Sequence, residues 1–434
     1  MKRFLLSLVL VATTATAYAT PAIQRWTTDN GVPVYFMPAP EIPMFKLRVV
    51  FDAGSARDRK SAGLAMLTSA LLGEGTVDLS TDDFHAQVEA TGAQIGSGVL
   101  RDMAWISLRS LTDPTTAEPA LQLLRAMLVS PRFSEDIFDR ARKQIQAGLQ
   151  NEKVAPEALG DKALQRAIYH AHPYGTPTGG TETSIAGLAP ADVQAFHARY
   201  YTTSNAIVVI VGALSPQQAR LVANEIVEGL PVGEPAPALP EVTELSEGSD
   251  EHIPLAGQQS HLFYGQVGIK RKDPDYFSLV VGNHVLGGNA TSILFNEIRE
   301  KRGLSYSVSS YFEPMAERGP FLTTLQVDSA RLTEARAVLE ETLAKFIEVG
   351  PTRAQLDAAK RNLIGSFPLR IDNNSKLLEY LTVIAFYRLP LDYLESYPRS
   401  VAAVTLAEVK DAFKRRIALG HMARITVGPL AVSK

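Results

Sequence analysis

The sequence predicts an α+β protein with two duplicated domains, each a mainly antiparallel sheet with helices packed on one face. Three observations lead to this fold class. The chain has 434 residues, of which 46% are hydrophobic and 21% charged, and one core rarely serves more than roughly 250 to 300 residues. A proline-rich stretch divides the chain into halves of similar size, and motifs recur between them. In each half, helical spacing follows runs with β-strand spacing, which favours sheets with segregated helices.

Residues 1–19 have the pattern of a secretory signal peptide. Lys2 and Arg3 are positive, residues 4–12 are apolar, and residues 17–19 read Ala-Tyr-Ala, an A-x-A cleavage site. The alternative is a buried N-terminal helix. The absence of Cys excludes a lipid-attachment cysteine and a thiolate metal site. No later apolar run reaches the roughly 20 residues of a membrane span. We therefore expect a periplasmic protein, or else a secreted one, with no membrane span.

The net charge argues against nucleic acid as a partner. It is −3 for the whole chain, and loss of Lys2 and Arg3 with the leader lowers it to −5. Such a chain has no basic field to attract phosphates.

The domain organisation follows from the proline-rich stretch. Residues 231–252 contain the sequence PVGEPAPALP and then a polar run, and proline at that density stiffens a chain and removes backbone donors, as in a linker. We therefore predict one domain over residues 20–230 and a second over residues 253–434.

Two patterns recur between these domains at a similar offset. Residues 211–212 and 427–428 both read Val-Gly after an apolar run and lie 216 positions apart. Residues 141–145 and 359–363 lie 218 positions apart, each within helical apolar spacing. This regularity indicates internal duplication.

Periodicity places the elements within each half. The expected strands are residues 46–51, 104–109, 206–211, 261–267, 305–312, 321–327 and 423–427. The expected helices are residues 62–72, 81–91, 118–128, 135–151, 156–170, 291–302, 332–349 and 352–366.

The first motif is the segment 63–76, GLAMLTSALLGEGT. It resembles the zinc helix of the pitrilysin/insulinase metallopeptidases, whose frame is Gly-Leu-Ala-His-x-x-Glu-His-x-x-x-x-Gly-Thr. On a helix the two His and the Glu share one face, so the imidazoles reach a metal with a carboxylate base beside them. In this chain the three positions are Met66, Ser69 and Ala70.

The resemblance implies a third ligand, a Glu, roughly eighty residues downstream. That position falls at Gly148, or at Gln146 if the frame slips. A Met thioether suits copper(I) better than zinc, and Ala and Gly offer no ligand. Of the eight histidines, the one close pair is His170 and His172, whose surroundings resemble a structural turn of the same family. We expect no metal or other cofactor in this chain. We expect Met66, Leu67, Ala70 and Leu71 to form an apolar helix face packed in a core.

The second motif covers residues 286–308 and resembles the family's Gly-rich turn, helix and Arg/Tyr segment. In that segment an Arg precedes a Tyr by seven residues, as Arg299 precedes Tyr306. The resemblance implies that the Arg anchors substrate backbone, that the Tyr donates to the developing oxyanion, and that Gly287, Gly288 and Asn289 contact substrate. A guanidinium fork and a phenol suit these roles. The alternative is that Arg299 ends a charged surface helix and Tyr306 packs in a strand.

The resemblance extends over the mature chain and includes the run 200–205 and the turn 172–175. It is closest to the short bacterial branch and the mitochondrial processing peptidase, in which one subunit carries the metal and the other the Arg/Tyr pair. It implies a chain that is inactive alone and complements a homologous zinc-binding subunit with an intact His-x-x-Glu-His, the two acting on peptide substrates. A catalytically dead structural or peptide-binding scaffold is the second hypothesis. A zinc peptidase acting by itself would require ligands that the sequence lacks.

Overall fold

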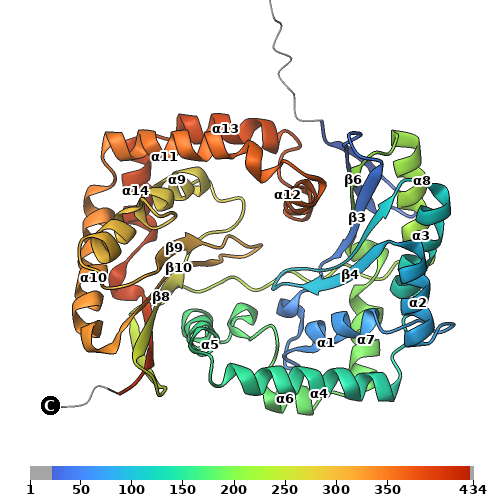
Figure 1. Ribbon diagram of the computed structural model, residues 1–434, viewed down its shortest axis with the longest axis horizontal. Coiled ribbons are helices and arrows are strands. Elements are labelled where there is room, and N and C mark those ends of the chain that lie inside the picture. Colours follow the sequence, from blue (N-terminus) through green and yellow to red (C-terminus); the bar gives the residue numbers. More distant parts are fainter. Residues whose placement is uncertain (1–21, 431–434) are drawn as a thin grey trace, which may run out of the picture.

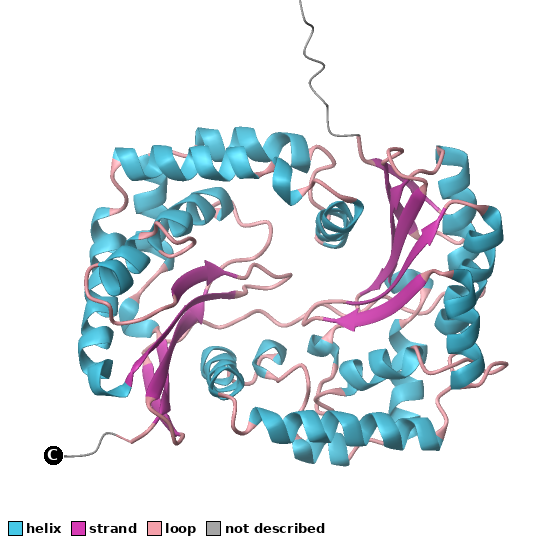
Figure 2. Cartoon of the chain, viewed as in Figure 1, coloured by secondary structure: helices cyan, strands magenta, loops and turns pink. Residues whose placement is uncertain are grey.

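The computed structural model describes residues 22–430. Two β-sheets face each other across the middle of the molecule, and most helices lie on their outer sides (Figures 1 and 2). The predicted signal peptide lies outside the described residues, so its assignment stays a prediction.

The first sheet has six strands in the order β1-β2-β6-β3-β5-β4, and all its pairings are antiparallel except that of β2 with β6. The strands are β1 (Gln24–Thr27), β2 (Pro33–Pro38), β3 (Met44–Phe51), β4 (Gln94–Val99), β5 (Ala104–Leu111) and β6 (Ala206–Gly212). The second sheet has five strands in the order β7-β11-β8-β10-β9, with only β7 and β11 parallel. Its strands are β7 (Ser249–Pro254), β8 (Gln259–Val267), β9 (Val308–Phe312), β10 (Pro320–Asp328) and β11 (Ala423–Gly428).

The two sheets have the same connectivity. In both, the last strand of the half lies between a parallel neighbour and an antiparallel one, and a hairpin completes the antiparallel side. The first sheet differs only by the additional edge strand β1. The predicted fold class, two related α+β domains with mainly antiparallel sheets, is confirmed.

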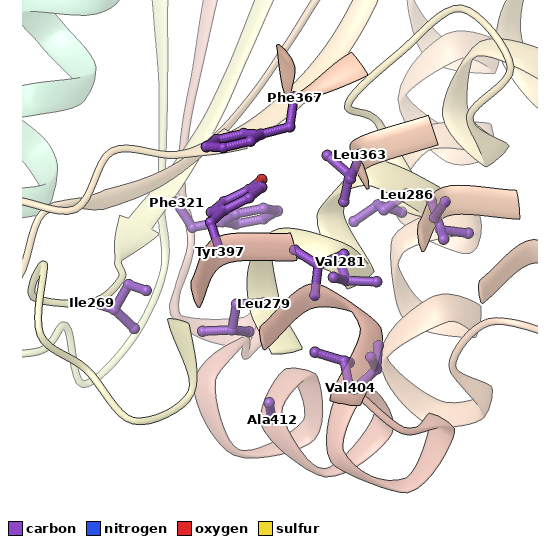
Figure 3. Packing of buried hydrophobic residues seen from close by; sticks show 14 of the residues in the cluster. Ile269, Leu279, Val281, Leu286, Phe321, Leu363, Phe367, Tyr397, Val404 and Ala412 are labelled. Atoms are coloured by element: carbon purple, nitrogen blue, oxygen red, sulfur yellow. The ribbon is translucent and has the colours of Figure 1, made fainter. Parts of the chain in front are cut away.

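The helices of the first half are α1 (Leu64–Leu72), α2 (Thr81–Thr91), α3 (Pro114–Val129), α4 (Glu135–Glu152), α5 (Pro156–Tyr169), α6 (Glu182–Ala186), α7 (Pro190–Tyr200) and α8 (Pro216–Val227). Those of the second half are α9 (Tyr276–Leu286), α10 (Leu332–Val349), α11 (Arg353–Ser366), α12 (Asn374–Phe386), α13 (Tyr393–Ala403) and α14 (Leu406–Arg416). In the second half, the core holds the stacked rings of Phe367 and Tyr397, whose centroids are 4.4 Å apart (Figure 3).

Two helices cross from one half to the other. Helix α5 packs on β8 and β11 of the second sheet, and α12 packs on β3 and β6 of the first. Gly160 of α5 lies so close to β8 that a Cβ there would come within 2.1 Å of the Phe263 ring. The two helices begin 218 positions apart, the offset of the internal repeat. Each sheet thus carries its own helices on one face and one exchanged helix on the other, which fastens the halves together.

The structure corrects several predicted bounds. The last four residues of the predicted linker, 249–252, lie in β7, where they pair with β11. The predicted strand 305–312 begins only at Val308, and the predicted helix 291–302 is replaced in part by a π-helix, Phe295–Glu300. Strands β1, β2, β4 and β7 are not among the predicted strands. Their sequences show no clear alternation of apolar and polar residues, because they are short, proline-flanked, glycine-containing or polar.

One half-buried histidine, His197, makes stability depend on pH. His197 of α7 stacks on the Tyr201 ring, and its Nε2 donates to the Leu128 carbonyl at 3.0 Å. Burial lowers the pKa of His197 from 6.5 to about 4. The neutral ring therefore stabilises the fold fully above pH 6.5, and this contribution is lost as the pH falls towards 4, because the unfolded chain takes up the proton first. The loss amounts to roughly 3 kcal/mol.

Urea unfolding at pH 7 and pH 4.5 tests this expectation. His197→Gln keeps an N–H donor but does not ionise, so the difference in unfolding free energy between the two pH values should be smaller than in the unmodified chain. Equal pH dependence in the two proteins would show that His197 titrates normally in the fold.

Candidate functional site

The frame of the degenerate motif is retained because it builds helix α1. Gly63 precedes the helix at φ +90°, where a Cβ would come within 2.5 Å of the Ile185 side chain. The Asp58 carboxylate accepts from the backbone N–H groups of Gly63 at 2.7 Å and Ala65 at 2.8 Å, which satisfies donors at the helix start. Leu67 and Leu71 are fully buried in the first core.

The positions of the family's two His ligands and its Glu base lie on this helix and differ in exposure. Met66 is half-buried, Ser69 is buried and Ala70 is exposed. The prediction that Met66, Leu67, Ala70 and Leu71 form one packed apolar face is therefore confirmed for Leu67 and Leu71 and wrong for Ala70.

The position of the third ligand lies on α4, which packs against α1. Gly148 is exposed, and a Cβ there would meet no atom within 4 Å. Gln146, two residues earlier, is half-buried. Between residues 22 and 430, no three or more His, Asp or Glu side chains are grouped to hold a metal ion. The donor set at Met66, Ser69, Ala70 and Gly148 does not fit the zinc that the resemblance implies.

Of the pair His170 and His172, it is the His172 side chain that is used in a turn. The Nδ1 of His172 accepts from the Tyr174 N–H at 3.1 Å, and its Nε2 donates to the Pro240 carbonyl at 3.0 Å. Both ring nitrogens are therefore used within the protein, as the interpretation of residues 172–175 as a structural turn requires.

In the second half, the Gly-rich turn allows the backbone to pass close to β9. A Cβ on Gly287 would lie 2.3 Å from Ser310 Oγ, and one on Gly288 would lie 2.8 Å from His284 Cα. The Ser310 N–H donates to the Gly287 carbonyl at 3.1 Å. Asn289 closes the turn, since its Oδ1 accepts from the Thr291 N–H at 2.7 Å.

The π-helix that follows carries Arg299. The Lys301 N–H donates to the Asn296 carbonyl at 2.9 Å, five residues back, which widens this turn relative to an α-helix. Such insertions are frequent at functional sites. The Arg299 guanidinium lies 4.7 Å from the centre of the Phe295 ring, and its Nη1 donates weakly to the Tyr306 carbonyl at 3.4 Å.

Tyr306 stands out of the protein surface. Its side chain is 86% exposed, more than that of any other large hydrophobic residue in the described chain. It occupies a loop in which Ser305 Oγ donates to the Ser307 carbonyl at 2.7 Å and accepts from the Ser307 N–H at 3.1 Å. The alternative that Tyr306 packs in a strand is therefore wrong.

A cavity of about 650 Å³ brings most of the second motif together. Gly287, Gly288, Asn289 and Tyr306 all line it, whereas Arg299 does not and instead contacts the Phe295 ring and the Tyr306 carbonyl. The sequence does not single out three further lining residues, Arg271, His284 and Arg370, because none lies at a motif spacing. Burial lowers the pKa of His284, with the nearby Arg370 adding to the effect, so this ring tends to stay neutral.

Comparison with known proteins gives the same family for both halves. The model described as "Insulinase (Peptidase family M16)" matches residues 39–182, and that described as "Peptidase M16 inactive domain" matches residues 187–363. A peptidase M16 inactive domain from Pseudomonas fluorescens, a solved structure, is 36% identical with a TM-score of 0.91, and the match covers 95% of this chain and 99% of that one.

Two relatives come from one strain of Helicobacter pylori. The non-peptidase homolog YmxG is 26% identical over 418 residues, covering 95% of each chain. The zinc protease PqqE is 23% identical over 384 residues, covering 85% of each chain.

Between residues 22 and 430, no helix combines the length and apolar character needed to cross a bilayer.

Proposed function

This chain belongs to peptidase family M16, the insulinase family, and on that premise we propose that it is the metal-free subunit of a two-chain zinc metalloendopeptidase acting on peptides. A homologous subunit with an intact His-x-x-Glu-His supplies the zinc and the base. This chain supplies Arg299, Tyr306 and the Gly-rich turn. The complex acts in the periplasm, where the predicted signal peptide directs this chain.

One observation carries the proposal: Tyr306 is exposed in a chain whose own metal positions are empty of ligands. Exposing a large aromatic side chain forgoes the stabilisation that burial would bring. Tyr306 lines a cavity together with the Gly-rich turn, and its backbone carbonyl accepts from the Arg299 guanidinium. Such an arrangement suits a group that completes a site on another protein.

The chemistry of the two side chains divides between binding and reaction. The Arg299 guanidinium presents several N–H donors in one plane and holds a backbone carbonyl of an extended peptide. The phenol of Tyr306 donates to the oxygen that gains negative charge when the scissile carbonyl becomes tetrahedral. Neither role requires a metal ligand from this chain.

The second candidate is a scaffold that binds peptides or a partner without taking part in hydrolysis. It is favoured by the relatives, since one is named a non-peptidase homolog and another an inactive domain. A scaffold has no use for an oxyanion donor, however, and retention of Arg299 with Tyr306 at family spacing favours the complementing subunit.

Arg299→Ala tests the proposal in the complex of this chain with a homologous zinc subunit. Loss of a backbone anchor weakens both the ground state and the transition state, so KM should rise and kcat fall together. Arg302→Ala is the matched control, because Arg302 lies three residues on and pairs with Glu297 at 2.8 Å. Equal kinetics for the two variants would favour the scaffold.

A further inference from the structure

A second cavity, of about 750 Å³, lies where the two halves of the chain meet. Its walls come from the first sheet, the linker over residues 235–239, the segment 270–272 and the end of α12. Arg299, Tyr306 and the Gly-rich turn do not line it, although Arg271 lines both this cavity and the cavity of about 650 Å³ at the proposed peptide site.

The walls of this cavity carry an excess of positive charge. Six Lys or Arg residues line it against three Asp or Glu residues. Two of the cations are neutralised, since Arg57 pairs with Asp52 at 2.6 Å and Lys270 with Glu317 at 2.8 Å. The remaining carboxylate, Asp102, accepts from hydroxyl and backbone donors. The other four cations form no ion pair with any residue between 22 and 430; they are Arg25, Arg271, Lys272 and Arg388.

The Arg271 guanidinium lies near two aromatic rings and forms no ion pair with a carboxylate in the described chain. Its guanidinium carbon lies 5.9 Å from the centre of the Tyr276 ring and 5.3 Å from that of Tyr387. Its Nε is buried and has no hydrogen-bond partner in the described chain. A buried donor without an acceptor is costly, and more so on a charged group.

Arg388 occupies a position that normally belongs to glycine. It follows α12 at φ +51°, and its N–H donates to the Ala385 carbonyl at 3.2 Å while the Leu389 N–H donates to the Ile384 carbonyl at 2.8 Å. This is a Schellman motif, whose left-handed residue is usually Gly and sometimes Asn. An Arg there keeps backbone strain that either residue would relieve, and strain of this kind concentrates at functional sites.

We propose that this cavity binds a small oxyanion with two or more negative charges, of the phosphate or polycarboxylate type. Arg25 comes from the first half and Arg271, Lys272 and Arg388 from the second, so the bound anion joins the halves. Its charge offsets the four unpaired cations, and its oxygens accept from the N–H groups of those cations that face the cavity.

Isothermal titration of the purified chain with pyrophosphate, inorganic phosphate or citrate, at constant ionic strength, tests this site. We expect saturable binding of one anion per chain. Tighter binding of pyrophosphate assigns the site to phosphate groups, and tighter binding of citrate assigns it to carboxylates. Absence of saturable binding by all three would overturn the proposal.

Two variants locate the site. Arg388→Asn should fold readily, because Asn tolerates the left-handed region. It should raise the urea midpoint of the anion-free chain and lower the affinity for the anion about tenfold or more. Arg271→Gln should weaken it similarly. The control Arg353→Gln changes an exposed Arg on α11 that pairs with Asp357, and should bind as the unmodified chain does. Unchanged affinity in both cavity variants would refute the assignment, and neither measurement involves a partner subunit.

Discussion

Tyr306→Phe should lower the turnover of the two-subunit complex by roughly two to three powers of ten, with little change in peptide affinity. The substitution removes only the hydroxyl, and a donor that acts on the oxyanion stabilises the transition state but not the bound substrate. The 86% exposure of the side chain means that no internal contact is lost. Single-turnover and steady-state rates of peptide cleavage measure the effect.

The control for Tyr306→Phe is Tyr380→Phe, which removes a hydroxyl from a ring that packs against Phe367 in the second core. It should leave turnover within about twofold of the unmodified complex. Assembly with the partner should survive the Tyr306 change, so equal amounts of complex can be compared. A complex that keeps full turnover with Phe at position 306 would remove the oxyanion role.

Asp102→Ala should destabilise the chain by about 3 to 5 kcal/mol. Asp102 is 4% exposed, lies in the first half, and accepts from the Tyr387 hydroxyl at 2.8 Å and the Ala316 N–H at 2.7 Å, both in the second half. It also accepts from the Tyr174 hydroxyl at 2.5 Å. Removing the carboxylate takes the charged acceptor from the buried Tyr174 hydroxyl, the half-buried Tyr387 hydroxyl and the exposed Ala316 N–H, and breaking such a network at the contact between the halves is costly.

Urea unfolding at neutral pH measures this loss, with Asp357→Ala as the control. Asp357 forms an exposed pair with Arg353 four residues away on α11, and such pairs contribute less than about 1 kcal/mol. Asp102→Asn keeps one acceptor oxygen and should fall between the two. If Asp102→Ala were as stable as the control, the network would not be what joins the halves.

Much of the fold could be predicted from local pattern. The helix predicted over residues 81–91 has those bounds in the structure, because Ser80 caps its start and Gly92 ends it at φ +65°. The recurrence of residues 141–145 at 359–363 correctly indicated two related domains. These features depend on residues that are neighbours in the sequence, so the local spacing of apolar and capping residues predicts them directly.

The exchange of α5 and α12 could not be predicted in the same way. The apolar spacing of residues 156–170 shows that one face is buried but not which sheet buries it. The network around Asp102 was also missed, because its partners lie 72 or more positions away. Local sequence carries no information about contacts of that separation.

The candidate sites also include features that the sequence predicts and features that only the structure shows. The family frame around Met66, Ser69, Ala70 and Gly148 predicts a degenerate metal site, because those side chains stand where the resemblance places ligands and the base. The exposure of Tyr306 was not predictable, since an aromatic residue before a β-rich run fits a buried strand equally well. The cavity at the contact between the halves requires the three-dimensional structure, because its cations come from four separate segments.

The most direct test of the account is the rate of peptide hydrolysis by this chain, by a homologous zinc subunit with an intact His-x-x-Glu-His, and by an equimolar mixture of the two. We expect negligible hydrolysis by either protein alone and rapid hydrolysis by the mixture, because each holds only part of the site. Full activity of a mixture in which Arg299 and Tyr306 are both replaced would contradict the account and leave this chain a scaffold.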